Sequence, residues 1–83
     1  MAEQNRDLAG LVDSLVRPLV DFEEDLEITS SVEGDTESIE IRVNEEDAGK
    51  VIGRQGRVIK SIRTLARAAA SRNGMQVEVE ILD

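Results

Sequence analysis

The 83-residue chain contains neither cysteine nor histidine. Without cysteine there is no disulfide framework and no thiolate metal site, and the composition fits a reducing compartment. Zinc catalysis, serine–histidine relays and cysteine nucleophiles all lose their usual groups. Acid–base chemistry would have to rest on carboxylates and lysine alone, and no constellation of them stands out. We therefore expect a protein that is not an enzyme and that carries no cofactor or metal.

Aromatic residues and long apolar runs are also scarce. Phe22 is the single aromatic residue, so base stacking on aromatic rings, on which many single-strand binders rely, is almost unavailable. No stretch approaches the roughly 18 consecutive apolar residues of a membrane-spanning helix. The first ten residues, MAEQNRDLAG, lack the basic and then apolar pattern of a signal peptide. We expect a cytoplasmic protein with no membrane partner.

Positive charge is in short supply. The formal net charge is −8, with 18 acidic and 10 basic residues. This excess favours solubility and argues against polyanion binding over the whole surface. A chain of this length forms one domain with a modest core, so we expect residues 1–83 to be a single domain. Any nucleic-acid site must therefore be local.

The N-terminal half is predicted to fold as a helix followed by a hairpin. Apolar residues recur at helical spacing over residues 5 to about 17, with Asn5 as the N-cap and Pro18 close to the end. We expect this apolar stripe to lie in the core. Apolar and polar residues alternate over 26–33 and 39–43, which predicts two strands joined by a loop of moderate length.

The C-terminal half predicts two helices and a last strand. Asn44 is a suitable N-cap for a short helix over about 45–52. A longer helix runs from about Arg57 to Arg72 and stops at Asn73-Gly74. Residues 77–81 alternate as a strand. The predicted order is α-β-β-α-α-β, an α+β fold.

Two acidic runs have ordinary structural explanations. Glu45, Glu46 and Asp47 fill the first turn of a predicted helix, where the helix dipole favours negative charge. The run from Asp21 to Asp25 is a polar connector without the spacing of a calcium loop. We expect no metal at either.

The basic residues gather in one segment, KVIGRQGRVIKSIRTLARAAASR, at residues 50–72. It holds seven of the ten basic residues and no acidic one. On a helix of about 100° per residue, one stripe is basic. Its members are Arg57, Lys60, Arg63 and Arg67. The opposite side carries residues expected in the core, namely Val58, Ile59, Ile62, Leu65, Ala66 and Ala69. Exposed helices usually mix charge signs because ion pairs stabilise them, so a stripe without acids is unusual.

The tetrapeptide Gly53-Arg54-Gln55-Gly56 lies just before this stripe, between two helices. Glycine at both ends permits positive φ and a close backbone approach. The helix that follows presents unpaired N–H groups and a positive dipole end, both suited to a phosphate. Arg54 would point outward and offer a fork of donors to phosphate oxygens. The alternative is a plain helix–turn–helix connection with a C-cap glycine, since the spacing alone is a weak signal.

The string VIGRQGRVIK, placed after a strand and between a short and a long helix, resembles the G-x-x-G motif of a KH domain. This module clamps about four nucleotides of single-stranded nucleic acid. The element order resembles the type II arrangement. With RPLVD after the first helix and VIGRQGRVIKSIRTLARAAA in the middle, the whole chain is similar to the bacterial KhpA family of small RNA-binding proteins. The resemblance implies a three-stranded mixed sheet with three helices on one face.

The resemblance also implies a site for single-stranded RNA. The G-x-x-G residues would contact the sugar-phosphate backbone, and the bases would lie in an apolar groove between the two helices and a strand edge. With the basic stripe, the candidate RNA-binding residues are Gly53, Arg54, Gln55, Gly56, Arg57, Lys60, Lys50, Arg63 and Arg67. The residues that would support the loop and line the groove are Val51, Ile52, Val58 and Ile59.

Partners and cellular roles follow from the resemblance alone. It implies a homodimer or a complex with a KhpB-like KH-containing protein, with RNA chaperoning or post-transcriptional regulation linked to cell elongation and cell-wall homeostasis. The alternative is a protein-interaction module, in which the basic helix docks an acidic partner or a second copy. Acidic residues outside the segment would repel RNA, so one domain should bind weakly and gain from a partner. The sequence does not separate RNA from single-stranded DNA, because backbone contacts do not require a 2′-hydroxyl.

Overall fold

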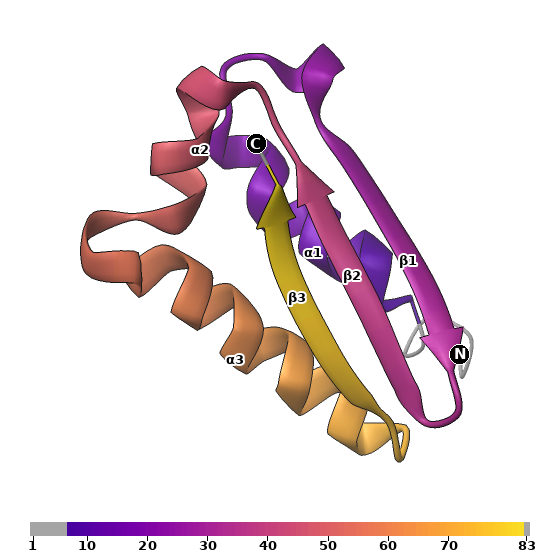
Figure 1. Cartoon of the computed structure of the whole chain (residues 1–83). Coiled ribbons are helices and arrows are strands. Elements are labelled where there is room, and N and C mark those ends of the chain that lie inside the picture. Colours follow the sequence, from indigo (N-terminus) through magenta and orange to yellow (C-terminus); the bar gives the residue numbers. More distant parts are fainter. Residues whose placement is uncertain (1–6, 83) are drawn as a thin grey trace.

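The computed structural model describes residues 7–82. It is an α+β fold in which three helices cover one face of a three-stranded sheet, and the expected order α-β-β-α-α-β is confirmed (Figure 1). The helices are α1 (Leu8–Val16), α2 (Glu45–Ile52) and α3 (Arg57–Arg72), and the strands are β1 (Glu27–Glu33), β2 (Thr36–Arg42) and β3 (Gln76–Leu82). Short 3-10 turns lie at Arg17–Leu19, Glu23–Asp25 and Arg54–Gly56.

The sheet is mixed and has the order β1-β2-β3. β1 and β2 are antiparallel, with Ile28 opposite Ile41, whereas β2 and β3 are parallel, with Ile39 opposite Val79. A parallel partner requires a crossover, which α2 and α3 provide. β1 and β3 are therefore the two edges of the sheet, and α3 runs back along the β3 edge (Figure 1).

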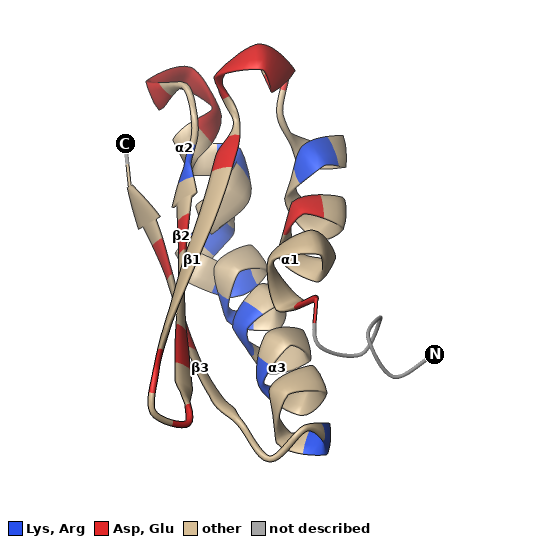
Figure 2. Cartoon of the chain, turned by 90° about the vertical axis from the view of Figure 1, so that its right-hand side faces the viewer, with Lys and Arg blue, Asp and Glu red and all other residues tan. Residues whose placement is uncertain are grey.

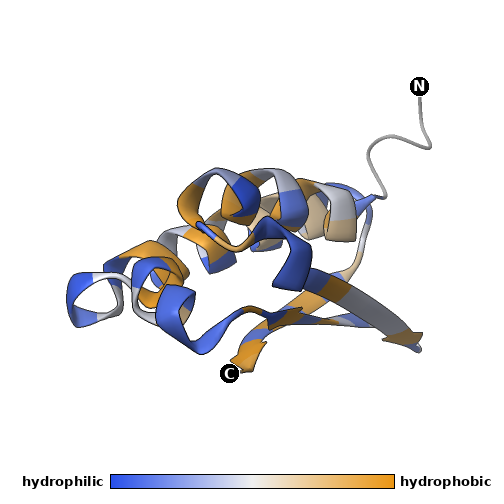
Figure 3. Ribbon diagram, turned by 90° about the horizontal axis from the view of Figure 1, so that it is seen from above, coloured by the Kyte–Doolittle hydropathy of each residue, from blue (hydrophilic) through white to orange (hydrophobic). Residues whose placement is uncertain are grey.

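The core lies between the sheet and the helices, which are all on one side of the strands (Figures 2 and 3). In β2 and β3 alternate residues point into it, as the period of a half-buried strand requires. Its most buried apolar members are Leu8, Val12, Val16, Ile39, Ile41, Val51, Ala66 and Ala70. The stripe of the first helix thus contributes to the core as expected, through Leu8, Val12 and Val16.

Helix α1 begins later than predicted. Asp7 is its N-cap and accepts a hydrogen bond from the Gly10 N–H at 2.8 Å, so the helix starts at Leu8. The predicted N-cap, Asn5, lies outside the described residues. Pro18 falls in the 3-10 turn directly after α1, consistent with its expected place near the helix end.

Two further expectations are corrected. Leu65, expected in the core, is 50% exposed, because the buried side of α3 is centred on Ile59, Ile62, Ala66 and Ala70 and leaves Leu65 at its margin. The hairpin loop, expected to be of moderate length, is the two-residue turn Gly34-Asp35, and β2 begins at Thr36 rather than near residue 39. No helix in residues 7–82 has the length and apolarity needed to cross a membrane.

Candidate nucleic-acid interface

The G-x-x-G segment connects α2 to α3 with an unusual backbone. Gly53 has φ 79° and ψ 171°, a combination that is essentially restricted to glycine. Gln55 (φ 59°) and Gly56 (φ 74°) follow in the left-handed region, and a residue with a Cβ is uncommon there. Arg54 and Gln55 are both exposed. The segment is therefore a tight turn that holds two polar side chains at its tip.

Gly53 is also required by packing. A Cβ at this position would lie 2.4 Å from Val58 Cγ2 and 2.8 Å from the Val58 backbone N. At Gly56 no atom lies within 4 Å of the corresponding position. The first glycine thus lets the start of α3 close onto the end of α2, whereas the second supplies only conformational freedom.

The start of α3 is uncapped. Its N-cap is Gly56, so no side chain accepts from the N–H groups of the first turn. These N–H groups and the helix dipole favour an anion at this end of the helix. Val51 and Ile59 are buried beneath the loop, Val58 is half-buried, and Ile52 is 37% exposed beside it. Of the predicted support residues, Ile52 and Val58 are therefore accessible to a ligand, while the other two hold the loop in place.

Four predicted cations remain free on this side of the molecule. Arg54, Arg57, Lys60 and Arg67 are exposed, and within residues 7–82 their side chains form no hydrogen bond or ion pair. Basic residues follow α3, while acidic residues gather on the strands and on the connectors that precede β1 and α2 (Figure 2). The predicted separation of charge is thus present in the structure, and most of the stripe is available to a polyanion.

Arg63 differs from the rest of the stripe. It is half-buried, and its Nε donates to the backbone carbonyl of Val79 at 3.0 Å. The bond joins the middle of α3 to the free edge of β3, so this guanidinium is a tie between two elements as well as a positive charge. The helical periodicity of the sequence predicted that Arg63 lies on the basic stripe. It could not predict the hydrogen bond to Val79, which lies 16 positions further along the chain.

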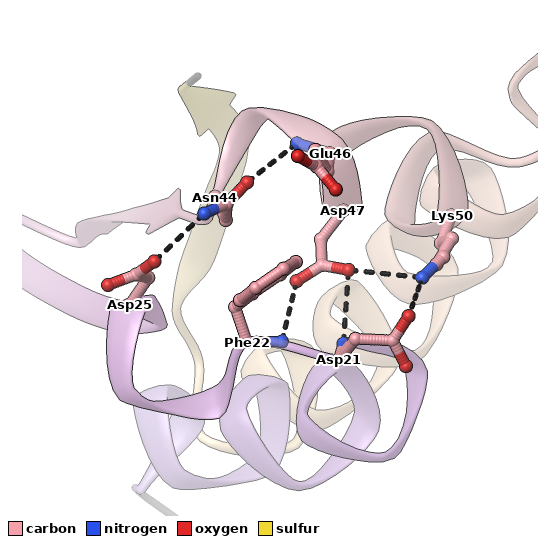
Figure 4. Close-up of polar contacts among 7 residues, drawn as sticks. All are labelled: Asp21, Phe22, Asp25, Asn44, Glu46, Asp47 and Lys50. Carbon is pink, nitrogen blue, oxygen red and sulfur yellow. Dashed lines mark hydrogen bonds and ion pairs between the residues drawn. The ribbon is translucent and has the colours of Figure 1, made fainter.

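Lys50, the predicted flanking cation, is already paired. Its ammonium contacts Asp21 and lies 3.2 Å from Asp47 Oδ1 (Figure 4). Hydrogen bonds to Asp21 and Asp47 raise the pKa of Lys50. The structure therefore places Lys50 near the loop in sequence, but two carboxylates offset its charge.

Asp47 has a role that sequence reasoning missed. Its side chain is fully buried, and its carboxylate accepts the backbone N–H groups of Asp21 and Phe22, each at 3.0 Å (Figure 4). Burial works to raise the pKa of Asp47, but these hydrogen bonds and the one from Lys50 outweigh it, so the pKa lies below its usual value. The carboxylate thereby anchors the acidic connector before β1 onto α2. Sequence reasoning missed this role because Asp47 is one of three acidic residues in the first turn of a helix, and the helix dipole alone explained that pattern.

The outer face of the sheet is acidic. Thr29, Glu40 and Glu80 form one row across the three strands, and Ser31, Ser38 and Glu78 form the next. The three glutamates are exposed. Like charges on neighbouring strands repel each other and any polyanion. No group of acidic residues in the described part of the chain is arranged to hold a metal ion.

Comparison with known proteins identifies the relatives of this chain. A family model described as the KhpA/KhpB KH domain matches residues 9–81. The RNA-binding protein KhpA of Listeria monocytogenes is 42% identical over 73 residues, which cover 88% of this chain and 96% of the relative. The RNA-binding protein KhpA of Borreliella burgdorferi is 42% identical over 74 residues, covering 88% and 89%.

A third relative, the RNA-binding protein KhpA of Leifsonia xyli, is 40% identical over 76 residues, which cover 92% of this chain and 97% of the relative. No solved structure matches the chain. The fold, the G-x-x-G turn between α2 and α3, and these matches over most of the chain agree with one another. The chain therefore belongs to the KhpA/KhpB family of KH domains.

Proposed function

We propose that this chain is a non-enzymatic, cytoplasmic protein that binds single-stranded RNA through the G-x-x-G turn and the exposed side of α3. The observation that carries this proposal is a set of free, exposed cations beside an uncapped helix start. Arg54, Arg57 and Lys60 have no partner within residues 7–82, and α3 begins at Gly56 without a side-chain cap. The names of the relatives support RNA as the ligand.

Binding would proceed through the RNA backbone. The N–H groups at the start of α3 and the Arg54 guanidinium donate to phosphate oxygens, and the positive φ values at Gly53 and Gly56 let the strand approach the backbone of the turn. The bases would pack against the aliphatic side chains of Ile52 and Val58, which replaces aromatic stacking in a chain with one aromatic residue. Arg57, Lys60 and Arg67 extend the electrostatic track along α3.

The acidic outer face of the sheet supports a weak, one-sided interaction. Single-stranded RNA would be confined to the α3 side, and a second module would be needed for high avidity. We further propose that residues 1–83 act as one module, as a homodimer or with a KhpB-like partner, in RNA chaperoning or post-transcriptional regulation linked to cell elongation and cell-wall homeostasis. These last roles rest on the family resemblance.

The alternative function is a protein-interaction module, and one observation favours it. Exposed basic residues lie along α3 and exposed acidic residues on the strands, in different layers of the fold (Figure 2), so two copies could associate through complementary charge. RNA binding and self-association are separable by measuring both on the same variants.

The testing experiment is fluorescence anisotropy with a short single-stranded RNA, comparing the wild type with Arg54→Asp/Gln55→Asp. Aspartate tolerates the left-handed backbone of Gln55 better than most residues, so the turn should persist. We expect affinity to fall at least about tenfold, because two acids would face phosphate. Arg42→Asp/Ser31→Asp changes the net charge equally on the outer sheet face and is the matched control. Equal losses in both variants would mean that the turn is not the site.

A further inference from the structure

A pocket of about 350 Å³ lies beyond the candidate site. It is lined by Arg67 and Ser71 of α3, by Met75 just before β3, and by Gln76 and Val77, the first two residues of β3. None of the G-x-x-G residues borders it. Its size is at the lower end of the range for small-ligand sites, about 300–1,000 Å³.

The pocket continues the seam between α3 and the free edge of β3. The two elements run in opposite directions (Figure 1), and Arg63 contacts Val79 at the middle of the seam. Arg67 lies one helical turn after Arg63, and Val77 lies two residues before Val79, so this pair comes next along the seam. The part of the seam nearer the G-x-x-G turn lies on the other side of Arg63. The pocket is therefore the distal half of the same edge on which the bases would lie.

Both polar and apolar groups are available in the pocket. Arg67 is exposed and unpaired within residues 7–82, Gln76 is exposed, and Met75 is half-buried. Carbonyl directions alternate along a strand, so the Val77 carbonyl points to the same free edge as that of Val79. A strand edge of this kind offers backbone donors and acceptors to a planar ligand.

We infer that this pocket is a second nucleotide subsite, which takes a base of the same single-stranded RNA beyond those held at the G-x-x-G turn; the inference rests on the proposed function. The base packs against Met75. It forms hydrogen bonds with the side-chain amide of Gln76 and with the backbone carbonyl of Val77, while Arg67 contacts the adjoining phosphate. Arg67 lies 11 residues after Gly56, or about 16 Å along α3. A G-x-x-G turn clamps about four nucleotides, so we expect the nucleotides that continue beyond these along α3 to occupy the pocket.

The inference is tested with a length series of oligouridylates, from about four to about ten nucleotides, against the full chain. For the wild type we expect about a tenfold gain in affinity once the RNA is long enough to reach the pocket. Ser71→Leu places a larger side chain at the pocket, and Arg67→Gln removes the phosphate contact. Ala68→Leu introduces the same residue at an exposed position of α3 outside the pocket lining and is the matched control.

Ser71→Leu should bind the four-nucleotide RNA as the wild type does and lose most of the gain with length, whereas Ala68→Leu should keep that gain. Arg67→Gln, which also removes a charge from the track, should weaken binding of the longer RNAs. Amide NMR signals of Gln76 and Val77 should shift with the longer RNA and not with the shorter. A length gain that survives in Ser71→Leu, or that is absent from the wild type, would overturn the subsite. Failure of the wild type to bind any RNA would instead overturn the proposed function.

Discussion

The Nε of Arg63 and the carbonyl oxygen of Val79 are 3.0 Å apart, and this bond joins the middle of α3 to the free edge of β3. It satisfies an edge carbonyl that the sheet leaves unpaired, and it divides the α3–β3 seam into a half near the G-x-x-G turn and a half that contains the pocket. One side chain of the basic stripe thus has a structural role, while its neighbours stay free for a ligand.

Replacing Arg63 should separate its two roles. Arg63→Lys keeps the charge but not the Nε donor, and we expect the free energy of unfolding to fall by about 1 kcal/mol, the net value of a hydrogen bond in proteins. Arg63→Met should lose similar stability and also weaken RNA binding. Urea denaturation and anisotropy measure the two effects. If Arg63→Lys were as stable as the wild type, the contact to Val79 would contribute nothing to folding.

The two glycines of the turn should differ in their tolerance of alanine. Gly53→Ala meets Val58 at less than 3 Å with an unfavourable φ, so we expect a loss of about 3 kcal/mol or more. Gly56→Ala meets no neighbouring atom and should cost only the left-handed penalty of about 1 kcal/mol.

Truncating the neighbour provides a further check on the Gly53 contact. Val58→Ala removes the Cγ2 atom that lies 2.4 Å from the added Cβ, so the double variant Gly53→Ala/Val58→Ala should lose less stability than the sum of the two single variants. Only part of the loss should be recovered, since Cβ and N of residue 58 still lie 2.7 and 2.8 Å from the added Cβ. Thermal or chemical denaturation measures all three. Equal effects of alanine at both glycines would show that backbone conformation alone, and not packing on Val58, selects Gly53.

Asp47 should make the fold sensitive to acid. Because its pKa in the folded state is depressed, its contribution is fully present above the unfolded value of about 4 and is lost as the pH falls through the folded pKa. Asp47→Asn removes this contribution and turns an amide toward the N–H groups of Asp21 and Phe22. We expect its melting temperature at pH 7 to be lower by on the order of 10 °C.

The difference between Asp47→Asn and the wild type should narrow as the pH falls below about 4. The carboxyl of the unfolded chain takes up a proton there, whereas that of the folded protein, whose pKa is lower, stays ionised to a lower pH. Asp13→Asn is the control, since Asp13 pairs with Arg17 near the surface and should shift the melting temperature by no more than about 4 °C. Circular dichroism melts across pH 3–7 measure both. A gap that stayed constant over that range would contradict an ionised Asp47 in the folded protein.

Salt should report which cations meet phosphate. On a single strand, each neutralised phosphate contributes about −0.7 to the slope of log affinity against log salt. An RNA that contacts all four free cations should therefore show a slope of about −3. These cations are Arg54, Arg57, Lys60 and Arg67. Arg57→Gln should reduce the slope by about 0.7. Arg72→Gln, a basic-to-neutral change at the last residue of the same helix, should leave it unchanged. A slope near zero in the wild type would favour the protein-interaction alternative.

Local sequence determined much of this fold. Apolar spacing, the Asn44 N-cap and the Asn73-Gly74 stop predicted the order of elements, because such signals act within a few residues of one another. The same is true of the turn, whose glycines lie where two helices must be joined within a few residues. Leu65 was predicted wrongly because periodicity gives the direction of a side chain but not the width of the buried face. The hairpin loop was predicted too long because apolar alternation begins at Ile39, whereas pairing with β1 already begins at Thr36.

The amino-acid sequence by itself determined that the chain has one basic helix face preceded by a glycine-bounded turn. Only the tertiary structure decided which of those charges are free. Lys50 is offset by Asp21, Arg63 is held by Val79, and Asp47 is buried as an acceptor for the connector. These partners lie 16 to 29 residues apart in the chain, and no local pattern encodes such pairs. The physical reason is that a charged group is free or satisfied according to what the fold brings against it.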